Sequence, residues 1–289
     1  MSIVYLNGDY LPMKEAKISP MDRGFLFGDG IYEVVPSYNG RLVGFGPHMQ
    51  RMKNGLAEVE ILLHHKEEQW REIAEQLITQ NSKSGIENNL GIYFHVSRGA
   101  DTNRFHAYPQ GVEPTVFAFT FEIPPSPTTD KKAAKAYKVS TAQDLRWNRC
   151  HIKSTALLGN VMHFQQGHAQ GSDETLLFNE NNELTEAAAC NAYIVKGGVV
   201  ATPPLDNQIL PGITRQILLD ILSTDGSIPI EERVISKEEV FTADEVWITS
   251  STKDIAPVIT VDDQPVGNGQ VGPVWEAAQK LFSLQKFDY

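Results

Sequence analysis

One lysine in this sequence is placed where it could act as a nucleophile. Lys153 is the only lysine between Lys138 and Lys196, and its neighbours Ile152 and Ala156 are apolar. Burial disfavours the charged form of a lysine, which lowers its pKa and frees the amine to attack a carbonyl carbon. A Schiff-base lysine requires this property. The alternative is a surface lysine whose stem covers apolar neighbours, and the local sequence by itself favours that alternative.

A carboxylate, Glu186, stands before a run of small residues, Ala187-Ala188-Ala189-Cys190. Small side chains allow a backbone or a flat ring to approach closely, and a carboxylate there could keep a ring nitrogen protonated. The commoner alternative is a solvated glutamate in a helix or a loop.

One further segment could bind a phosphate, and another offers a cluster of hydroxyl groups. Leu210-Pro-Gly-Ile-Thr-Arg215 combines a glycine-containing turn with the start of a helix predicted over Thr214–Leu222. Helix N-termini bind phosphate through free N–H groups and the helix dipole. Ser250-Ser251-Thr252 follows a predicted strand and offers hydroxyl groups. The ordinary alternatives are a capped helix start and a turn.

Composition limits the partners of the chain. The 289 residues are 41% hydrophobic and 21% charged, which is typical of globular proteins. The net charge of −11 argues against nucleic acid or an anionic membrane as the main partner, because both favour basic surfaces. No apolar run reaches the roughly 20 residues needed to span a bilayer, and the N-terminus lacks the features of a secretory signal. We therefore expect a cytoplasmic protein.

Metal and dinucleotide binding are both disfavoured. Two cysteines exclude a disulfide scaffold or a four-cysteine zinc site. His163 and His168 do not share a helical face, so we expect no metal. Gly267-Asn-Gly-Gln-Val-Gly272 matches the dinucleotide fingerprint, but too little chain follows for the βαβ unit that this mechanism needs, so we expect a turn.

The elements that position these residues fall into two halves. Asn7-Gly8 and Asn39-Gly40 predict tight hairpins, because both central positions of a type I′ turn require positive φ. Ile123–Asp130 carries three prolines in four residues and predicts a linker. The expected organisation is a small N-terminal domain over 1–122, a linker over 123–130 and a large domain over 131–289. The expected elements are strands over 3–6, 9–11, 32–38, 41–45, 90–97, 115–122, 137–141, 175–178, 192–195, 199–202 and 246–249, and helices over 47–60, 66–81, 155–170, 214–222, 236–241 and 274–284.

Strands and helices do not alternate regularly along the chain, so the pattern predicts an α+β protein. Together, the motifs resemble the class IV aminotransferases, the fold-type IV enzymes that use pyridoxal 5'-phosphate. The segments that carry the resemblance span nearly the whole chain in the family's order: Asp22–Glu33, His48–Arg51, Ile152–Ser154, Thr185–Asn191 and Leu210–Arg215. It implies a small α/β domain, a larger pseudo-barrel domain that binds the cofactor, and a homodimer.

The resemblance also implies roles for single residues. Lys153 would form the internal aldimine and move a proton, and Glu186 would be the partner of the pyridine nitrogen. Leu210 would pack on the ring, and the groups that hold the phosphate would be Arg51, Ile213, Thr214 and Ser250 or Ser251. The kinetics would be ping-pong, because one product leaves before the second substrate binds.

Within the family, the pattern is most similar to members that transaminate D-amino acids. Tyr32, Arg104 and His106 resemble a trap for the substrate α-carboxylate, an anion that accepts charge-assisted hydrogen bonds well. The implied reaction joins a D-amino acid, such as D-alanine, and a 2-oxo acid, such as 2-oxoglutarate.

Alternatives stay open at this point. Within the family they are transamination of branched-chain L-amino acids and lysis of aminodeoxychorismate. From a different class, a cofactor-binding protein without turnover ranks last, because Lys153 and Glu186 are both present. Many relatives carry hydroxyl residues where this chain has Ala187–Cys190, which implies fewer hydrogen bonds to cofactor or water.

Overall fold

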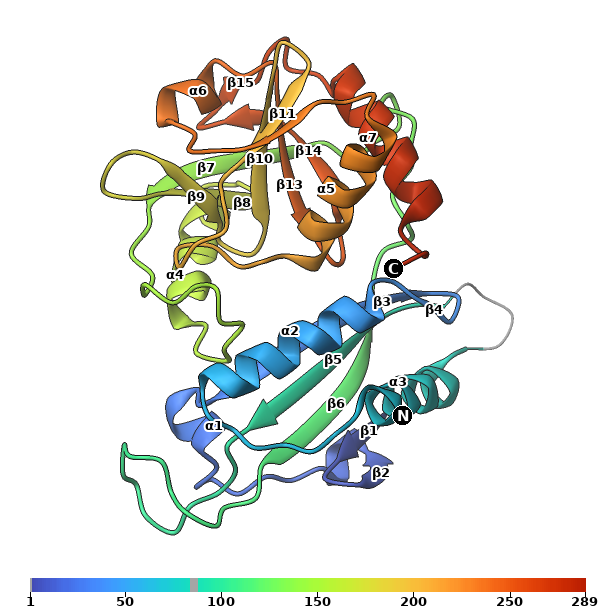
Figure 1. The fold of residues 1–289 in the computed structure, drawn as a ribbon, viewed down its shortest axis with the longest axis vertical. Coiled ribbons are helices and arrows are strands. Elements are labelled where there is room, and N and C mark those ends of the chain that lie inside the picture. The colour runs from blue at the N-terminus through green and yellow to red at the C-terminus, as the bar shows by residue number, and fades with distance from the viewer. Residues whose placement is uncertain (1, 84–87) are drawn as a thin grey trace. The chain divides into compact units, whose positions relative to one another are not determined.

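The computed structural model describes residues 2–83 and 88–289. By their contacts these residues form two compact units (Figure 1). Unit 1 takes in the chain up to Pro125 together with Ile152–Leu157 and Tyr289, and unit 2 takes in Ser126–His151 and Leu158–Asp288. The predicted domain scheme has Ile152–Leu157 in the second half, whereas these residues make their contacts with unit 1.

Unit 1 is built on an antiparallel sheet. In the described part of the chain it has six strands in the order β2-β1-β6-β5-β3-β4. Asn7 and Asn39 both have positive φ, which confirms the two predicted hairpin turns. The strands are β1 (Ile3–Leu6), β2 (Asp9–Pro12), β3 (Gly30–Tyr38), β4 (Arg41–Leu42), β5 (Asn89–Ser97) and β6 (Thr115–Glu122).

Two helices, α2 (Phe45–Glu58) and α3 (Glu67–Asn81), cover the sheet of unit 1 (Figure 1). The predicted helix over 66–81 is confirmed, and Trp70 on its buried face packs edge-on against Phe94 of β5, with ring centroids 5.4 Å apart. The prediction that a strand runs from Arg41 to Phe45 is wrong in its second half. Gly44, with φ 62°, is the N-cap of α2, so Phe45 is already helical.

Unit 2 contains a mixed sheet. Among the described residues it has nine strands, in the order β12-β11-β10-β13-β14-β7-β8-β9, with β15 paired to β14. The short turn over 188–190 joins β9, at one edge, to β10, near the other edge, so the sheet must curl. The strands are β7 (Tyr137–Gln143), β8 (Glu174–Phe178), β9 (Leu184–Ala187), β10 (Asn191–Lys196), β11 (Val199–Thr202), β12 (Ile230–Glu232), β13 (Glu245–Ser250), β14 (Asp254–Val261) and β15 (Gln264–Pro265).

The helices of unit 2 are α4 (Leu158–His168), α5 (Ile213–Asp225), α6 (Lys237–Phe241) and α7 (Pro273–Gln285), and α5 packs against α7. The expected start of α4 at Thr155 is wrong. The backbone N–H of Thr155 donates to the carbonyl of Gly30 at 2.9 Å, so this residue extends the sheet of unit 1 instead of a helix. Helix α6 begins with a capping box formed by Ser236 and Glu239.

The glycine-rich segment before α7 is a turn, as predicted. Gly267 and Gly269 have φ of 53° and 73°, and a Cβ on Gly267 would lie 2.4 Å from the carbonyl oxygen of Asp244. Within residues 2–83 and 88–289, no three His, Cys, Asp or Glu side chains gather as they would around a metal ion. None of the helices described has the length and apolar character needed to cross a membrane.

Candidate cofactor and substrate sites

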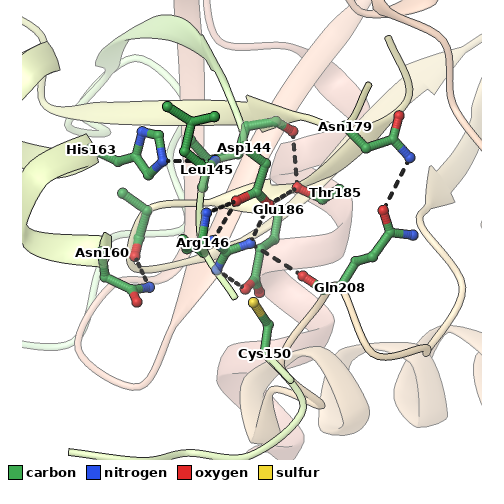
Figure 2. A network of polar contacts seen from close by, with 12 residues as sticks. Asp144, Leu145, Arg146, Cys150, Asn160, His163, Asn179, Thr185, Glu186 and Gln208 are labelled. Carbon is green, nitrogen blue, oxygen red and sulfur yellow. Dashed lines mark hydrogen bonds and ion pairs between the residues drawn. The ribbon is translucent and has the colours of Figure 1, made fainter. Parts of the chain in front are cut away.

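Glu186 lies on β9 inside a buried polar network of unit 2 (Figure 2). Its Oε1 accepts a hydrogen bond from Nη1 of Arg146 at 2.5 Å. Its Oε2 accepts from Nδ2 of Asn191 at 3.2 Å and from the backbone N–H of Leu210 at 3.1 Å. Both carboxylate oxygens therefore have donors. The alternative of a solvated glutamate in a helix or a loop is wrong, because Glu186 is buried on a strand.

Arg146 divides its donors between two carboxylates. Its Nε and Nη2 donate to Asp144 at 3.0 and 2.7 Å, and its remaining Nη1 donates to Glu186 (Figure 2). Burial would raise the pKa of Asp144, but the contacts with Arg146 hold it below its usual range. For Glu186 burial dominates and raises the pKa to about 7, even though Arg146 opposes the shift. Glu186 is therefore the more weakly stabilised of the two anions.

The start of α5 presents free backbone donors. Gly212 is its N-cap and supplies no side-chain cap, so the N–H groups of Ile213 and Thr214 have no partner within the helix. A Cβ on Gly212 would lie 1.9 Å from Oδ1 of Asn191, so only glycine fits there. Nδ2 of Asn191 also donates to the carbonyl of Leu210 at 2.9 Å. One amide side chain thus connects Glu186 to the turn that begins α5.

A buried hydroxyl lies close to that turn. Ser250 ends β13, and the preceding residue, Thr249, pairs with Asn191 across the sheet. In the described part of the chain, Oγ of Ser250 is buried, and its neighbour there is the thiol of Cys190, which is a weak acceptor. Buried polar atoms are almost always satisfied, so a hydroxyl with only this weak partner is consistent with a ligand that accepts from it. Ser251 follows in the next turn and is half-buried.

Lys153 is held next to β3 in unit 1. The backbone N–H of Tyr32 donates to the carbonyl of Lys153 at 3.1 Å, and Ile31 forms a β-bridge with Ser154. The Nζ atom of Lys153 lies 4.2 Å from the centroid of the Tyr32 ring. The lysine is half-buried, which is the environment predicted from its apolar neighbours.

Arg51, on α2, is bound by a fully buried carboxylate. Its Nε and Nη2 donate to Oε1 and Oε2 of Glu33, each at 2.7 Å. Nδ1 of His48 also lies 2.7 Å from Oε2 of Glu33. Burial would raise the pKa of Glu33, but Arg51 and His48 together lower it to about 2. Glu33 thus fixes the orientation of Arg51.

The three residues predicted to bind the α-carboxylate lie in different settings. Tyr32 stacks on Tyr93, with ring centroids 5.5 Å apart, and burial raises the pKa of Tyr93 to about 12. Arg104 and His106 lie in the exposed segment between β5 and β6, against the ring of Phe27 at 5.1 and 5.3 Å. Among the described residues, no hydrogen bond or ring contact joins this pair to Tyr32.

Sequence reasoning missed Arg146 and Asp144 altogether. Both lie just after β7, and nothing in their local sequence distinguishes Arg146 from the neighbouring Arg149. Their role depends on the parallel pairing of β7 with β8, where Gln143 lies opposite Phe178, which is a pairing between segments far apart in the sequence. Glu33 and His48 fell within the motifs that carried the resemblance, but no role was predicted for them.

Comparison with known proteins assigns the chain to the class IV aminotransferases, and the chain belongs to that family. A family model described as "Amino-transferase class IV" matches residues 30–261. The chain is 36% identical over 276 residues to the D-alanine aminotransferase of Bacillus licheniformis, covering 96% of this chain and 94% of that one. It is 35% identical over 284 residues to the D-alanine aminotransferase of Staphylococcus haemolyticus, covering 98% and 97%.

A solved structure supports the fold. The branched-chain aminotransferase of the archaeon Thermoproteus uzoniensis, solved with norvaline, has a TM-score of 0.86 to this chain, over 99% of this chain and 95% of that one, at 22% identity. The predicted α+β architecture of fold type IV is confirmed. The protein is an aminotransferase, and its cofactor is pyridoxal 5'-phosphate, as predicted.

Proposed function

We propose that this aminotransferase moves the amino group of a D-amino acid, such as D-alanine, to a 2-oxo acid, such as 2-oxoglutarate. The observation that carries the proposal is identity of 36% and 35% to two D-alanine aminotransferases over nearly the whole chain. The Arg104-Phe105-His106 segment supports it, because two cationic or polar donors one residue apart suit a carboxylate.

The residues of unit 2 fit the cofactor. Pyridoxal 5'-phosphate, when bound, supplies an electron sink for charge that develops at the substrate Cα. Glu186 would accept the hydrogen bond of the protonated pyridine nitrogen, and Leu210 would lie against the ring. The N–H groups that begin α5 and the hydroxyls after β13 would hold the phosphate, through Ile213, Thr214, Ser250 and Ser251.

Two residues of unit 1 would take part in the reaction, one by moving a proton and one by binding the phosphate. Lys153 would carry the cofactor and move the proton at Cα, and the Tyr32 ring beside its Nζ atom restricts where the amine can lie. Arg51 would bind the phosphate through the charge of its guanidinium. The Glu33 carboxylate limits Arg51 to one orientation, which reduces the entropy lost on binding.

We further propose a homodimer. Helix α4 buries His163 and Gly167, whereas its apolar residues Leu158, Val161 and Met162 are 72%, 57% and 64% exposed. Apolar side chains gathered along one short helix are typical of a surface that another chain covers. Arg104 and His106 are exposed as well, so they are available to a second copy of the chain.

The remaining predictions are retained as part of the proposal. Cys150 and Cys190 are free thiols, which fits a reducing compartment such as the cytoplasm. The partners are small amino-acid and 2-oxo-acid substrates, not nucleic acid or membrane. The 123–130 segment remains the proposed linker between a domain over 1–122 and one over 131–289.

One assay tests the reaction and its handedness. Purified enzyme with cofactor is given D-alanine and 2-oxoglutarate, or L-leucine and 2-oxoglutarate, and the glutamate formed is resolved on a chiral column. We expect D-glutamate from D-alanine, with parallel double-reciprocal plots. L-glutamate from L-leucine would establish the branched-chain alternative instead, and pyruvate release from aminodeoxychorismate would establish the lyase.

Borohydride reduction tests the role of Lys153. The reduced enzyme is digested, and the peptide that carries the cofactor is identified by mass. We expect the label on Lys153, and we expect Lys153→Ala to lose nearly all turnover because the amine that carries the cofactor is gone. Label on a different lysine would contradict the assignment.

Arg104→Ala tests the carboxylate trap. Loss of a charge-assisted contact worth about 1.5–3 kcal/mol should lower kcat/KM for D-alanine about ten- to a hundredfold. The loss should be similar for 2-oxoglutarate, because both substrates present the same carboxylate. Arg71→Ala is the matched control, since Arg71 lies on α3 with a side chain 44% exposed. Unchanged turnover of D-alanine by Arg104→Ala would refute the trap.

A further inference from the structure

The segment between β5 and β6 has no regular secondary structure from Gly99 to Pro114 apart from an isolated bridge at Ala100, yet it is firmly attached at its base. The attachment begins at Asp29, just before β3. Oδ2 of Asp29 accepts from Nε of Arg23 at 2.8 Å, and also from Nε of Arg98 at 2.8 Å. Oδ1 accepts from Nη2 of Arg98 at 2.9 Å. One carboxylate therefore orients two arginines.

Arg23 uses its remaining donors on the loop itself. Its Nη1 donates to the carbonyl of Phe105 at 2.6 Å, and its Nη2 donates to the carbonyl of His106 at 3.2 Å. The side chain of Arg23 is only 3% exposed. Because two consecutive carbonyls bind one planar guanidinium, the peptide between Phe105 and His106 has its orientation fixed.

Arg98 holds the far side of the same loop. Its guanidinium carbon lies 3.6 Å from the ring centroid of Tyr108. Its Nη1 and Nη2 donate to the carbonyls of Glu60 and Val59 at 3.0 and 2.6 Å. Hydrogen bonds to Asp29, Val59 and Glu60 therefore orient this arginine, and Tyr108 packs on it although the tyrosine side chain is exposed.

The fixed backbone decides where the neighbouring side chains point. Arg104 and His106 flank Phe105, and both lie against the ring of Phe27 while remaining exposed. The guanidinium of Arg23 lies 4.9 Å from the centroid of that ring. The two side chains thus point to a common side, which a single carboxylate ligand needs and which a free loop would seldom maintain.

We propose that Arg23 is a positioning residue that orients Arg104 and His106 for the substrate α-carboxylate, with Asp29 orienting Arg23. The inference rests on the proposed function, because it takes Arg104 and His106 as the groups that bind the carboxylate. Arg23 itself would not contact the substrate, but it would raise the affinity for substrate by orienting Arg104 and His106. Burial would raise the pKa of Asp29, but Arg98 and Arg23 hold it below its usual range, so the carboxylate is ionised at neutral pH.

The first experiment measures loop order without any substrate. Trypsin cleaves after Arg104 only when the chain around it can leave its attachment. Arg23→Lys keeps the charge but loses the two-pronged contact with the loop, so we expect cleavage after Arg104 at least fivefold faster. Arg71→Lys is the matched control, because Arg71 stacks on Phe45 at 4.3 Å far along the sequence from the loop, and we expect no change. An unchanged cleavage rate in Arg23→Lys would overturn the proposal.

A second variant keeps the test decisive if Arg23→Lys does not fold. Tyr108→Leu removes the stacking on Arg98 at an exposed position, so the core is untouched. We expect cleavage after Arg104 to be about threefold faster in this variant. An unchanged rate would count against the attachment of the loop at its base.

The second experiment separates positioning from general damage. In the native background, Arg23→Lys should lower kcat/KM for D-alanine and for 2-oxoglutarate about tenfold, mainly through KM, with the visible spectrum of the cofactor unchanged. In the Arg104→Ala/His106→Ala background the same change should cost less than twofold, because the groups that it positions are gone. Equal losses in both backgrounds would overturn the proposal. A wild-type enzyme inactive on D-alanine would refute the proposed function, while the cleavage test would still decide whether Arg23 orders the loop.

Discussion

Two buried glutamates, one in each unit, are both bound by an arginine, and yet their pKa values are shifted in opposite directions. Glu33 is 0% exposed and has its pKa lowered to about 2, whereas Glu186 is 5% exposed and has its pKa raised to about 7. Burial raises the pKa of both carboxyl groups. The difference lies in how many donors each carboxylate receives from its arginine.

Arg51 gives two donors to Glu33, and His48 adds a third contact. Arg146 gives two donors to Asp144 and one to Glu186. A charge-assisted contact is strong, but its effect is limited when the cation is shared. Glu33 is therefore a permanent structural anion, while Glu186 has capacity for one more proton donor. A pyridine N–H would supply that donor.

The largest effect should come from Glu33→Gln. Removing this charge leaves Arg51 and His48 buried with an incomplete partner, and breaking a buried pair costs about 3–5 kcal/mol. We expect a loss of that size in the free energy of unfolding from urea titration. Glu186→Gln is the matched control and should lose less, because Arg146 keeps its contacts with Asp144. Equal losses in the two variants would contradict the distinction between Glu33, which orients Arg51, and Glu186, which we propose as the partner of the cofactor.

The next effect is on turnover and separates the two glutamates in the opposite order. Glu186→Gln should retain the fold and lower kcat about 10²- to 10³-fold, since a neutral amide stabilises a protonated ring nitrogen poorly. Stopped-flow measurement of each half-reaction would give this rate directly. Wild-type turnover in Glu186→Gln would mean that the partner of the ring lies elsewhere.

A smaller effect follows from pH, with opposite sign for the two residues. The pKa of Glu33 is lowered from 4.5 to about 2, so its stabilisation is present above 4.5 and is lost as pH falls through that window. The pKa of Glu186 is raised from 4.5 to about 7, so its contribution is present below 4.5 and is lost as pH rises to 7. Within each of these pH ranges, the free energy of unfolding changes by about 1.4 kcal/mol per pH unit.

This measurement uses cofactor-free protein, because the pyridine nitrogen of the cofactor would itself change the protonation of the Glu186 carboxylate. Between about pH 5 and pH 7, inside the window set by the raised pKa of Glu186, we expect the wild type to lose stability relative to Glu186→Gln. The difference between wild type and Glu33→Gln should stay constant over the same range. A constant difference for both pairs would contradict the raised pKa of Glu186.

The parts of the fold that the sequence could predict are those whose signals lie close together in the chain. Local signals were sufficient for the hairpins at Asn7-Gly8 and Asn39-Gly40, and for the amphipathic helix α3, because each depends on residues close together in the chain. Lys153 could be singled out for a similar reason, since its apolar neighbours are adjacent in sequence. Strand β9 could not, because Leu184–Ala187 has only four residues, all of them buried, and shows no alternation of apolar and polar residues.

The partners of the chemical groups were the least predictable part. Glu186 was singled out by the small residues that follow it, but Arg146, which donates a hydrogen bond to it, lies 40 residues earlier. Arg51 was likewise named without Glu33 as its partner. These pairings depend on sheet register and on helix packing, which a single sequence does not display. The helix predicted to begin at Thr155 failed for the same reason, because Gly30 competes for its backbone N–H.

The return of Ile152–Leu157 to unit 1 has a consequence for how the protein is made. Domains generally fold as units while the chain emerges, with the N-terminal one first. Here the backbone N–H of Tyr32 donates to the carbonyl of Lys153, and the backbone N–H of Thr155 donates to the carbonyl of Gly30. Both hydrogen bonds need the Ile152–Leu157 segment, so unit 1 is incomplete when Pro125 leaves the ribosome. The edge of β3 around Ile31 then stays unpaired until part of unit 2 has been synthesised. The nascent chain therefore adds the segment that carries Lys153 to unit 1 just before α4 is synthesised.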